Sequence, residues 1–381
     1  MNDPENLFRR PPHVVQLLPA LDEGGVERGT VELNREFARR GLRSTVVSSG
    51  GRLAERIERD GGRHCLLDLK SKNVLTAPAR ARALRRLLAE LRPDLVHIRS
   101  RVPGWLFAGA NRTLGLPCVS TVHGLNRVSA YSRIMTAGAR VICPSSAVAD
   151  HIRAHYATPE ERIRVIPRGL DPQQFDPQRL DAAFLAAFRD QYGLAGRFVV
   201  LGVGRLTPLK GFDVLLRATD LARRRMPQIK TVIVGGAETA RQGYARELYR
   251  LAESLGLREH AVFAGSQSRM AEVYACGRVL VSGNHAKPEA FGRTMAEALA
   301  MGCPVIATRF GGALDIVRDG VNGWLVEPGD PAALADRLVT ASQTALTGLR
   351  EDALARFSLE AMVRATLAVY AEVLGSAEGN A

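Results

Sequence analysis

The chain has 381 residues, of which 46% are hydrophobic and 24% are charged. This composition excludes an intrinsically disordered chain, and the absence of any run of about 18 apolar residues argues against a membrane-spanning helix. Because one hydrophobic core rarely serves so long a chain, two domains are expected.

The charge is strongly basic and unevenly spread. The formal net charge is +13, and residues 1–195 hold 30 Lys and Arg against 20 Asp and Glu, which leaves +10 in that half. A basic surface attracts nucleic acid, anionic lipid headgroups or phosphorylated substrates. The alternative is an arginine-rich composition whose charges simply face water.

Five cysteines are scattered without a C-x-x-C spacing. This pattern predicts buried free thiols in a reducing compartment. The first residues, MNDPENLFRRPPH, lack an apolar signal core, so a cytoplasmic location is expected.

Short β-branched runs alternate with amphipathic helical stretches in the first half of the chain. This alternation predicts a parallel sheet with helices on both faces. The predicted strands are 13–18, 44–48, 65–69, 95–98, 118–122 and 141–143, and the predicted helices are 26–40, 52–60, 77–91 and 103–114.

The same pattern restarts in the second half, so the sequence predicts two successive doubly wound units. Three prolines in PRGLDPQQFDPQ place a hinge within residues 167–188. The closing helix, about 359–374, has no strand after it and is expected to cross back to the first domain. The predicted strands are 198–203, 231–234, 261–263, 279–282 and 304–308, and the other predicted helices are 212–225, 244–255, 270–275 and 291–300.

Ligands of open α/β sheets bind beyond the carboxyl ends of the strands, and with two such domains the central cleft is the expected site. The first loop there, residues 23–27, carries Gly24 and Gly25, which let backbone N–H groups approach a phosphate. The loop GVGRLTPLKG at 202–211 carries Arg205 and Lys210, which can bind phosphate. A tight turn and two solvated cations are the alternative readings.

A third loop, EAFGRTMAE at 289–297, opens a helix. Its first N–H groups, near Gly292, Arg293 and Thr294, can hold an anion. Glu289 precedes the helix and Glu297 follows about two turns later, so the two carboxylates can bind separate polyols on either side of a phosphate. A sugar nucleotide has this order of sugar, diphosphate and ribose.

Over nearly its whole length the chain resembles the retaining GT-B glycosyltransferases of family 4, also called glycosyl transferases group 1. The resemblance rests most specifically on PEAFGRTMAEALAMGCPVIAT at 288–308. HIRSRVPGWL and RVIPRG further resemble members that act in lipopolysaccharide core synthesis. The other matching motifs are GGVE at 24–27, STVHG at 120–124, VIPRGLD at 165–171, GVGRLTPLKG at 202–211 and GGALDIVRDGVNGWLVEPGD at 311–330.

The resemblance implies an α/β GT-B fold of two Rossmann-like domains facing a central cleft. Residues 1–170, joined by the closing helix at about 362–381, would bind the acceptor, and residues 171–361 would bind the nucleotide-sugar. Many relatives have Asn at the position of Arg168 and Glu at that of Asp315, and these departures bear on donor specificity.

The resemblance also implies a role for each candidate residue. His123, Arg205, Lys210 and Glu289 would form the catalytic set, in which His123 contacts the donor sugar and the two cations neutralise the diphosphate. The implied donor-binding residues are Gly24, Gly25, Arg205, Lys210, Glu289, Phe291, Gly292, Arg293, Thr294 and Glu297, with Glu297 on the ribose. Position alone would make His123 a core histidine, like His13 and His97.

The implied reaction moves a sugar from a nucleotide-diphosphate sugar, with UDP favoured, to a saccharide or glycolipid acceptor. Configuration would be retained, the diphosphate would take the acceptor proton, and domain closure would exclude water. No Asp-x-Asp follows a strand, so neither a metal nor another cofactor is expected. The basic first domain would sit against an anionic membrane surface at the inner face of the cell membrane, or against a phosphorylated glycolipid. The arginines expected to form this surface are Arg80, Arg82, Arg85 and Arg86, with Arg35, Arg39, Arg40 and Arg43.

Rival functions stay open at this point. A nicotinamide dehydrogenase would need G-x-G-x-x-G, which neither EGGVERG nor GVGRLT provides. A nucleotide-sugar epimerase shares the architecture. A nucleic-acid-binding protein would explain the charge, although aromatic residues are only 6% and do not interleave with the basic clusters, so no nucleic-acid partner is expected.

Overall fold

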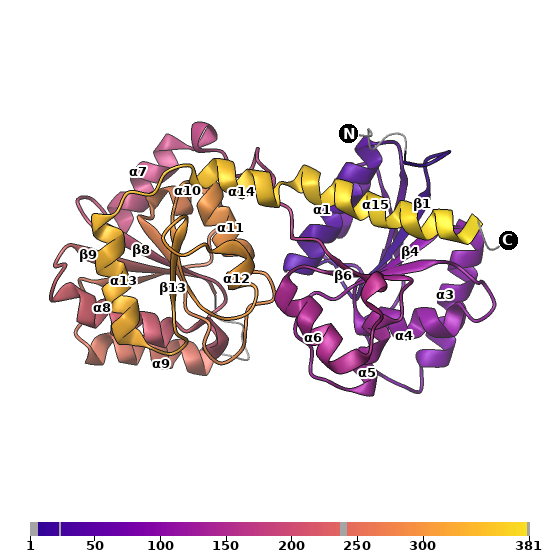
Figure 1. The fold of residues 1–381 in the computed structure, drawn as a ribbon, viewed down its shortest axis with the longest axis horizontal. Helices are drawn as coiled ribbons and strands as arrows, with labels where there is room; N and C mark the ends of the chain where they lie inside the picture. The colour runs from indigo at the N-terminus through magenta and orange to yellow at the C-terminus, as the bar shows by residue number, and fades with distance from the viewer. Residues whose placement is uncertain (1–6, 23, 237–241, 379–381) are drawn as a thin grey trace. The chain divides into compact units, whose positions relative to one another are not determined.

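Two parallel β-sheets, one in each half of the chain, organise the structure (Figure 1). The computed structural model describes residues 7–22, 24–236 and 242–378. Residues 1–169 together with 359–381 form one compact unit, unit 1, and residues 170–358 form the other, unit 2. Each unit is doubly wound, which confirms the predicted fold class.

Unit 1 contains a seven-stranded sheet of order β3-β2-β1-β4-β5-β6-β7, and every pairing in it is parallel. Its strands are β1 His13–Leu17, β2 Arg43–Ser48, β3 Arg63–Leu66, β4 Leu95–Ile98, β5 Cys118–Thr121, β6 Arg140–Cys143 and β7 Ile163–Val165. Its helices are α1 Gly25–Arg39, α2 Ala54–Arg59, α3 Ala77–Leu91, α4 Arg101–Ala110, α5 Ala130–Arg133, α6 Ser146–Tyr156 and α15 Leu359–Glu378.

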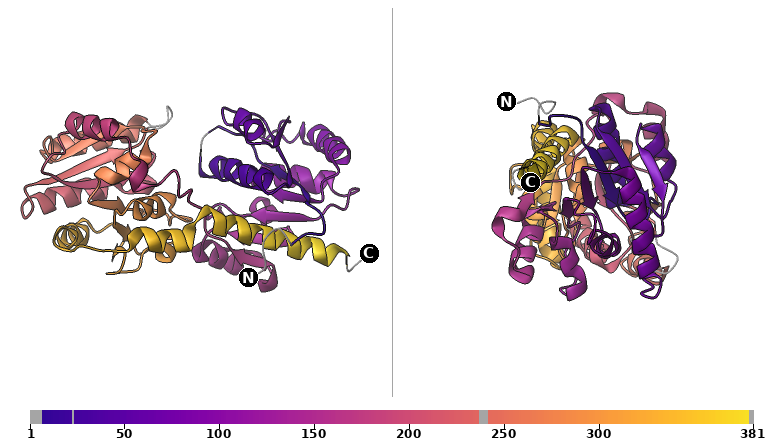
Figure 2. Two further views of the ribbon diagram at one scale, coloured as in Figure 1. Left: turned by 90° about the horizontal axis from the view of Figure 1, so that it is seen from above. Right: turned by 90° about the vertical axis from the view of Figure 1, so that its right-hand side faces the viewer.

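The closing helix α15, yellow in Figures 1 and 2, runs along unit 1. Its apolar residues join a core cluster with strand residues such as Val14 and Leu95 and with Phe37 of α1. Glu372 of α15 also accepts hydrogen bonds from Arg140, the first residue of β6, and from Arg164 in β7. The helix that ends the described chain is therefore built into the first sheet's core.

Unit 2 contains a six-stranded parallel sheet of order β10-β9-β8-β11-β12-β13. Its strands are β8 Phe198–Val203, β9 Ile229–Val234, β10 Ala261–Gly265, β11 Val279–Ser282, β12 Val305–Thr308 and β13 Gly323–Val326. Its helices are α7 Ala182–Gln191, α8 Phe212–Arg223, α9 Gln242–Ser254, α10 Met270–Cys276, α11 Arg293–Ala300, α12 Ala313–Ile316, α13 Pro331–Gln343 and α14 Leu349–Phe357.

Successive residues of the unit 2 strands enter two different cores. Leu201 and Leu280 pack with α10, α11 and α14, whereas Val200, Val279 and Val281 pack with α8 and α13. Because side chains alternate across a strand, the almost wholly apolar strand sequences bury both faces, as expected for a parallel sheet under two helical layers.

The structure corrects several details of the predicted elements. β3 begins two residues before the predicted strand and ends at Leu66, and α11 begins at Arg293 rather than Phe291. Segments without a predicted element form α6, β7, α7, β13, α13 and α14. Of the two tryptophans, Trp105 is 47% exposed, whereas Trp324 is buried. The predicted buried thiols are confirmed except at Cys118, which is half-buried.

Candidate functional site

The order of strands locates the candidate site of unit 2. From β8 the chain continues through β9 and β10 to one edge of the sheet, and it then returns to place β11 on the opposite side of β8. The strand order therefore reverses between β8 and β11, and the loops after these two strands lie at this switch point. Ligands of such sheets bind there. A Cβ placed on Gly211 would lie 1.9 Å from the Gly283 carbonyl oxygen, so the two loops are in direct contact and glycine is required.

The two loops join through an ion pair. Lys210 Nζ, after β8, lies 2.5 Å from Glu289 Oε2, after β11, and both side chains are partly exposed. Asn284, a buried residue that the sequence analysis missed, donates its amide to the same Glu289 oxygen at 3.5 Å. The structure therefore brings a predicted phosphate-binding cation and a predicted sugar-binding carboxylate to one point.

The backbone of Glu289 is fixed by the loop after β12. Gly312 N–H donates to the Glu289 carbonyl at 2.8 Å. Gly311 adopts φ +64°, and a Cβ there would lie 2.4 Å from Pro288 Cβ. The Gly-Gly pair thus lets two backbones approach closely, which holds the carboxylate beside Lys210.

The start of α11 lies beside this pair. Gly292 is the N-cap residue with φ +99°, and no side chain caps the helix. Its first N–H groups, at Arg293 and Thr294, lie where a helix terminus carries partial positive charge. Phe291 is buried against the ring of Phe357, with ring centroids 5.6 Å apart, so it anchors the turn and only its backbone remains to meet a ligand.

The second glutamate of the motif is buried. Glu297 accepts hydrogen bonds from Tyr274 Oη at 2.9 Å and from Arg293 Nε at 3.2 Å. Tyr274 lies on α10 and was not predicted as a site residue, because a tyrosine in an apolar helix gives no separate signal. The predicted role of Glu297 toward ribose stays a prediction.

Arg205 lies in the same loop as Lys210 and is exposed. Next to it, Leu206 N–H donates to the Gly236 carbonyl at 3.0 Å. A Cβ on Gly235 would lie 1.8 Å from the Gly204 carbonyl oxygen. The Arg205 backbone is therefore held between the ends of β8 and β9.

Unit 1 gathers a second set of predicted residues at the carboxyl end of its own sheet. Gly24, with φ +156°, is the N-cap of α1 and provides no capping side chain. Glu23, in the same predicted loop, lies outside the described residues. The Gly25 carbonyl accepts a hydrogen bond from Arg168 Nη1 at 2.9 Å.

His123 lies in this set, two residues after β5. Arg168 Nη2 lies 3.1 Å from His123 Nδ1, and Nε2 is buried with no hydrogen-bond partner among the described residues. Burial, together with the nearby charges of Arg168, Arg99 and His97, lowers the pKa of His123 well below its usual value. His97, by contrast, hydrogen bonds to Tyr370 and Thr121 and is a satisfied core histidine, as predicted.

Arg99, directly after β4, was also missed. It is buried, donates to Gln16 Oε1 at 3.2 Å, and its Nε has no partner among the described residues. Burial lowers the pKa of its guanidinium to about 10. In the run HIRSR nothing distinguishes this arginine from the solvated arginines of the first half; only the strand end places it here.

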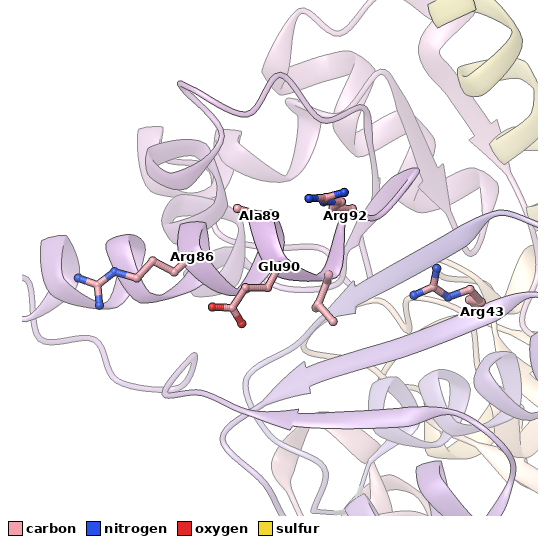
Figure 3. A pocket seen from close by; sticks show the side chains of 6 residues that line it. Arg43, Arg86, Ala89, Glu90 and Arg92 are labelled. Carbon is pink, nitrogen blue, oxygen red and sulfur yellow. The ribbon is translucent and has the colours of Figure 1, made fainter.

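A separate hollow of about 610 Å³ lies at the other end of the unit 1 sheet (Figure 3). It is lined by Arg43 at the start of β2, by Arg86 and Glu90 in the last turns of α3, and by Arg92 directly after that helix. It is thus at the amino ends of the strands and is not part of the candidate site.

No helix among the described residues is long and apolar enough to cross a membrane. Within those same residues, no three His, Cys, Asp or Glu side chains gather as a metal site would require.

Two family models together match most of the chain. The family model described as Glycosyltransferase Family 4 matches residues 23–174, and that of Glycosyl transferases group 1 matches residues 186–353. The solved structure of a glycosyltransferase from Rickettsia africae superposes with a TM-score of 0.87 at 28% identity, covering 96% of this chain and 99% of that chain.

Two curated relatives have names that specify a substrate. The D-inositol 3-phosphate glycosyltransferase of Xylanimonas cellulosilytica is 30% identical over 355 residues, 83% of each protein. The GDP-mannose-dependent alpha-(1-6)-phosphatidylinositol monomannoside mannosyltransferase of Mycolicibacterium smegmatis is 35% identical over 198 residues, covering 49% of this chain and 50% of that protein. The chain belongs to the family 4 glycosyltransferases, glycosyl transferases group 1, and is a glycosyltransferase of GT-B fold.

Proposed function

We propose that this glycosyltransferase retains anomeric configuration, needs no metal, and moves a sugar from a nucleotide-diphosphate sugar to a saccharide or glycolipid acceptor of the cell envelope, including lipopolysaccharide. The observation that carries the proposal is the Lys210–Glu289 contact at the switch point of unit 2. A cation for the diphosphate and a carboxylate for the sugar hydroxyls would have to meet there.

The roles follow from charge and position. Lys210 and Arg205 neutralise the leaving diphosphate with the N-terminus of α11, formed by Gly292, Arg293 and Thr294 after the buried Phe291. Glu289 binds the donor sugar. Glu297 binds the ribose, for which its two hydrogen bonds from Tyr274 and Arg293 hold it in place.

Unit 1 supplies the remaining groups. Gly24 and Gly25 present backbone at the start of α1, and His123 contacts the donor sugar. Unit 1 also takes the acceptor in this proposal.

The chemistry is a substitution at the anomeric carbon. The bond from that carbon to the diphosphate oxygen breaks, and the bond to the acceptor oxygen forms on the same face. The acceptor proton moves to the departing diphosphate. Negative charge therefore grows on the diphosphate, and cations already fixed at the switch point stabilise it without reorganisation.

For the donor and the acceptor, the proposal names chemical classes of substrate and not single compounds. UDP-sugars are favoured, with GDP-mannose as the competing donor because one relative depends on it. Both curated relatives have names that specify an inositol phosphate or phosphatidylinositol, so the acceptors to test first are phosphorylated polyols and glycolipids.

We also propose that unit 1 contacts an anionic membrane, although through a different surface from the one expected from the sequence. Arg80 is buried and donates to the Ser71 and Asn73 carbonyls, so it cannot face lipid. Arg35, Arg39 and Arg40 are all paired with Glu36. All four arginines belong to the basic surface expected from the sequence. Arg35, Arg40 and Arg80 are largely covered in the structure, whereas Arg39 stays 63% exposed and can still face lipid.

The loop before α3 is better suited to a bilayer. Val74 and Leu75 of this loop are 79% and 86% exposed, and Leu66, the last residue of β3, is 74% exposed. Apolar tips with nearby cations bind anionic bilayers through both burial and charge. The exposed cations of the loop and of α3 are Lys70, Lys72, Arg82, Arg85 and Arg86.

The test of the catalytic proposal is a thermal-shift and hydrolysis screen of UDP-, GDP- and ADP-sugars on the full chain. We expect one donor to raise the melting temperature and to be hydrolysed slowly, with Lys210→Ala and Glu289→Ala losing the hydrolysis. Arg224→Ala, which removes an exposed cation on the surface of unit 2, is the matched control. No shift with any nucleotide would overturn the proposal, and epimerised donor without transfer would favour the epimerase.

The membrane part has its own test, flotation with phosphatidylglycerol or phosphatidylcholine vesicles at low salt. We expect binding to the anionic vesicles only, and loss of it in Val74→Ser/Leu75→Ser. Arg224→Ala again serves as control. A wild type that ignores anionic vesicles would remove membrane contact from the proposal.

A further inference from the structure

The contact between Arg168 and His123 defines which ring nitrogen carries a proton. Arg168 Nη2 lies 3.1 Å from His123 Nδ1. A guanidinium has five N–H donors and no acceptor, so it can only donate. His123 Nδ1 must therefore accept, and it carries no hydrogen.

The protonation of the other ring nitrogen, Nε2, follows from this. A neutral imidazole with an accepting Nδ1 has its hydrogen on Nε2. This N–H is buried and has no protein partner among the described residues. Because an unpaired buried donor costs free energy, its natural partner is an acceptor oxygen of a ligand.

The doubly protonated form is disfavoured by the surroundings. The charged and titratable groups that act on His123 are Arg168, Arg99 and His97, and all of them lower its pKa, after the larger effect of burial. Protonation at Nδ1 would also place an N–H against the guanidinium. His123 therefore stays neutral across the physiological range.

Arg168 itself is held in place. Its other terminal nitrogen, Nη1, donates to the Gly25 carbonyl at 2.9 Å, at the start of α1. One guanidinium thus links the loops after β1, β5 and β7. An asparagine here would offer both a donor and an acceptor and would leave both tautomers of the histidine open.

We propose that Arg168 is a positioning residue that fixes His123 as the neutral Nε2–H tautomer, so that His123 acts as a hydrogen-bond donor to a substrate oxygen and not as a general base. The role in substrate binding rests on the proposed function, but the tautomer does not. A fixed donor cannot take the acceptor proton, which is consistent with the diphosphate taking it.

The first measurement is independent of activity. Nitrogen NMR of ¹⁵N-histidine-labelled full chain, with the His123 signals assigned by their loss in His123→Asn, reports the tautomer directly. We expect a protonated Nε2 and an unprotonated Nδ1 that do not titrate between pH 5.5 and 8. An Nδ1–H tautomer, or titration near pH 6.5, would overturn the proposal.

The second measurement uses variants. Arg168→Met removes the donor, whereas Arg168→Lys keeps a donor and a charge; circular dichroism establishes that each is folded. We expect His123 in Arg168→Met to titrate toward the ordinary histidine value of about 6.5 and kcat/KM to fall up to about tenfold between pH 7.5 and 5.5. Arg168→Lys should restore the flat profile. A flat profile in Arg168→Met would overturn the positioning role, whereas absence of any transferase activity with the tautomer intact would count against the proposed function alone.

Discussion

Lys210 Nζ lies 2.5 Å from Glu289 Oε2, although 79 residues separate them in the chain. The pair joins the loops after β8 and β11, at the one place in the unit 2 sheet where the strand order reverses. Partly exposed ion pairs contribute only about 0–1 kcal/mol to stability. The proposed role of the pair in donor binding can therefore be tested with little loss of stability.

Activity and stability should separate at this pair. We expect Lys210→Met and Glu289→Gln each to lower donor turnover at least about 100-fold, as removal of a group that stabilises developing charge does. The free energy of unfolding in urea should change by less than about 1 kcal/mol. A large stability loss with residual activity would mean that the pair is structural.

Gly211 should be irreplaceable for a steric reason. It adopts φ +65°, and a Cβ there would lie 1.9 Å from the Gly283 carbonyl oxygen. We expect Gly211→Ala to lose about 1–2 kcal/mol from the left-handed backbone and a further 1–3 kcal/mol from overpacking, along with donor binding.

Gly193 provides the matched control for that experiment. It has φ +60° but nothing within 4 Å of a Cβ, so Gly193→Ala should lose only the backbone contribution. Equal losses of unfolding free energy in the two variants would show that the close approach of the two loops is not what requires glycine at 211.

The stability of unit 1 should fall on mild acidification. Burial lowers the pKa of His97 well below 6.5 and that of His13 below its usual value. Below pH 6.5 these two histidines bind protons in the unfolded chain but stay neutral in the folded chain, so the free energy of unfolding falls as pH falls.

Urea unfolding at pH 7.5 and 5.5 measures this loss, which cannot exceed about 1.4 kcal/mol per pH unit for each histidine. His97→Gln should reduce the dependence. Carboxylates such as Glu372, whose pKa is lowered from 4.5 by its arginine partners, lose their contribution at lower pH. An unchanged slope in His97→Gln would contradict the assignment.

The N-cap of α13 offers a test remote from the site. Asp330 accepts hydrogen bonds from the N–H groups of Ala332 and Ala333, at 2.9 and 3.0 Å. We expect Asp330→Ala to destabilise unit 2 by about 1 kcal/mol and Asp330→Asn to retain most of the stability. Thermal unfolding compares the two, and full turnover in both would separate this cap from the donor site.

Much of the fold could be predicted from local pattern. β4, β8, β11 and α3 match their predicted ranges, because runs such as FVVLGV are apolar and β-branched and the helix has clear amphipathic spacing. β7 was missed because it has only three residues, and β13 because its sequence GWLV carries no such pattern. The start of α11 was misplaced because Gly292 takes φ +99°, which composition cannot indicate.

The sequence by itself determined the alternation of strands and helices, the family, and the two glutamates of EAFGRTMAE, since each depends on neighbours within a few residues. Only the tertiary structure decided which groups meet. It brought Lys210 to Glu289 across a strand-order reversal, buried Glu297 under Tyr274, and placed Arg168 on His123. Such contacts arise from the pairing order of the sheet, a long-range property that no local spacing encodes.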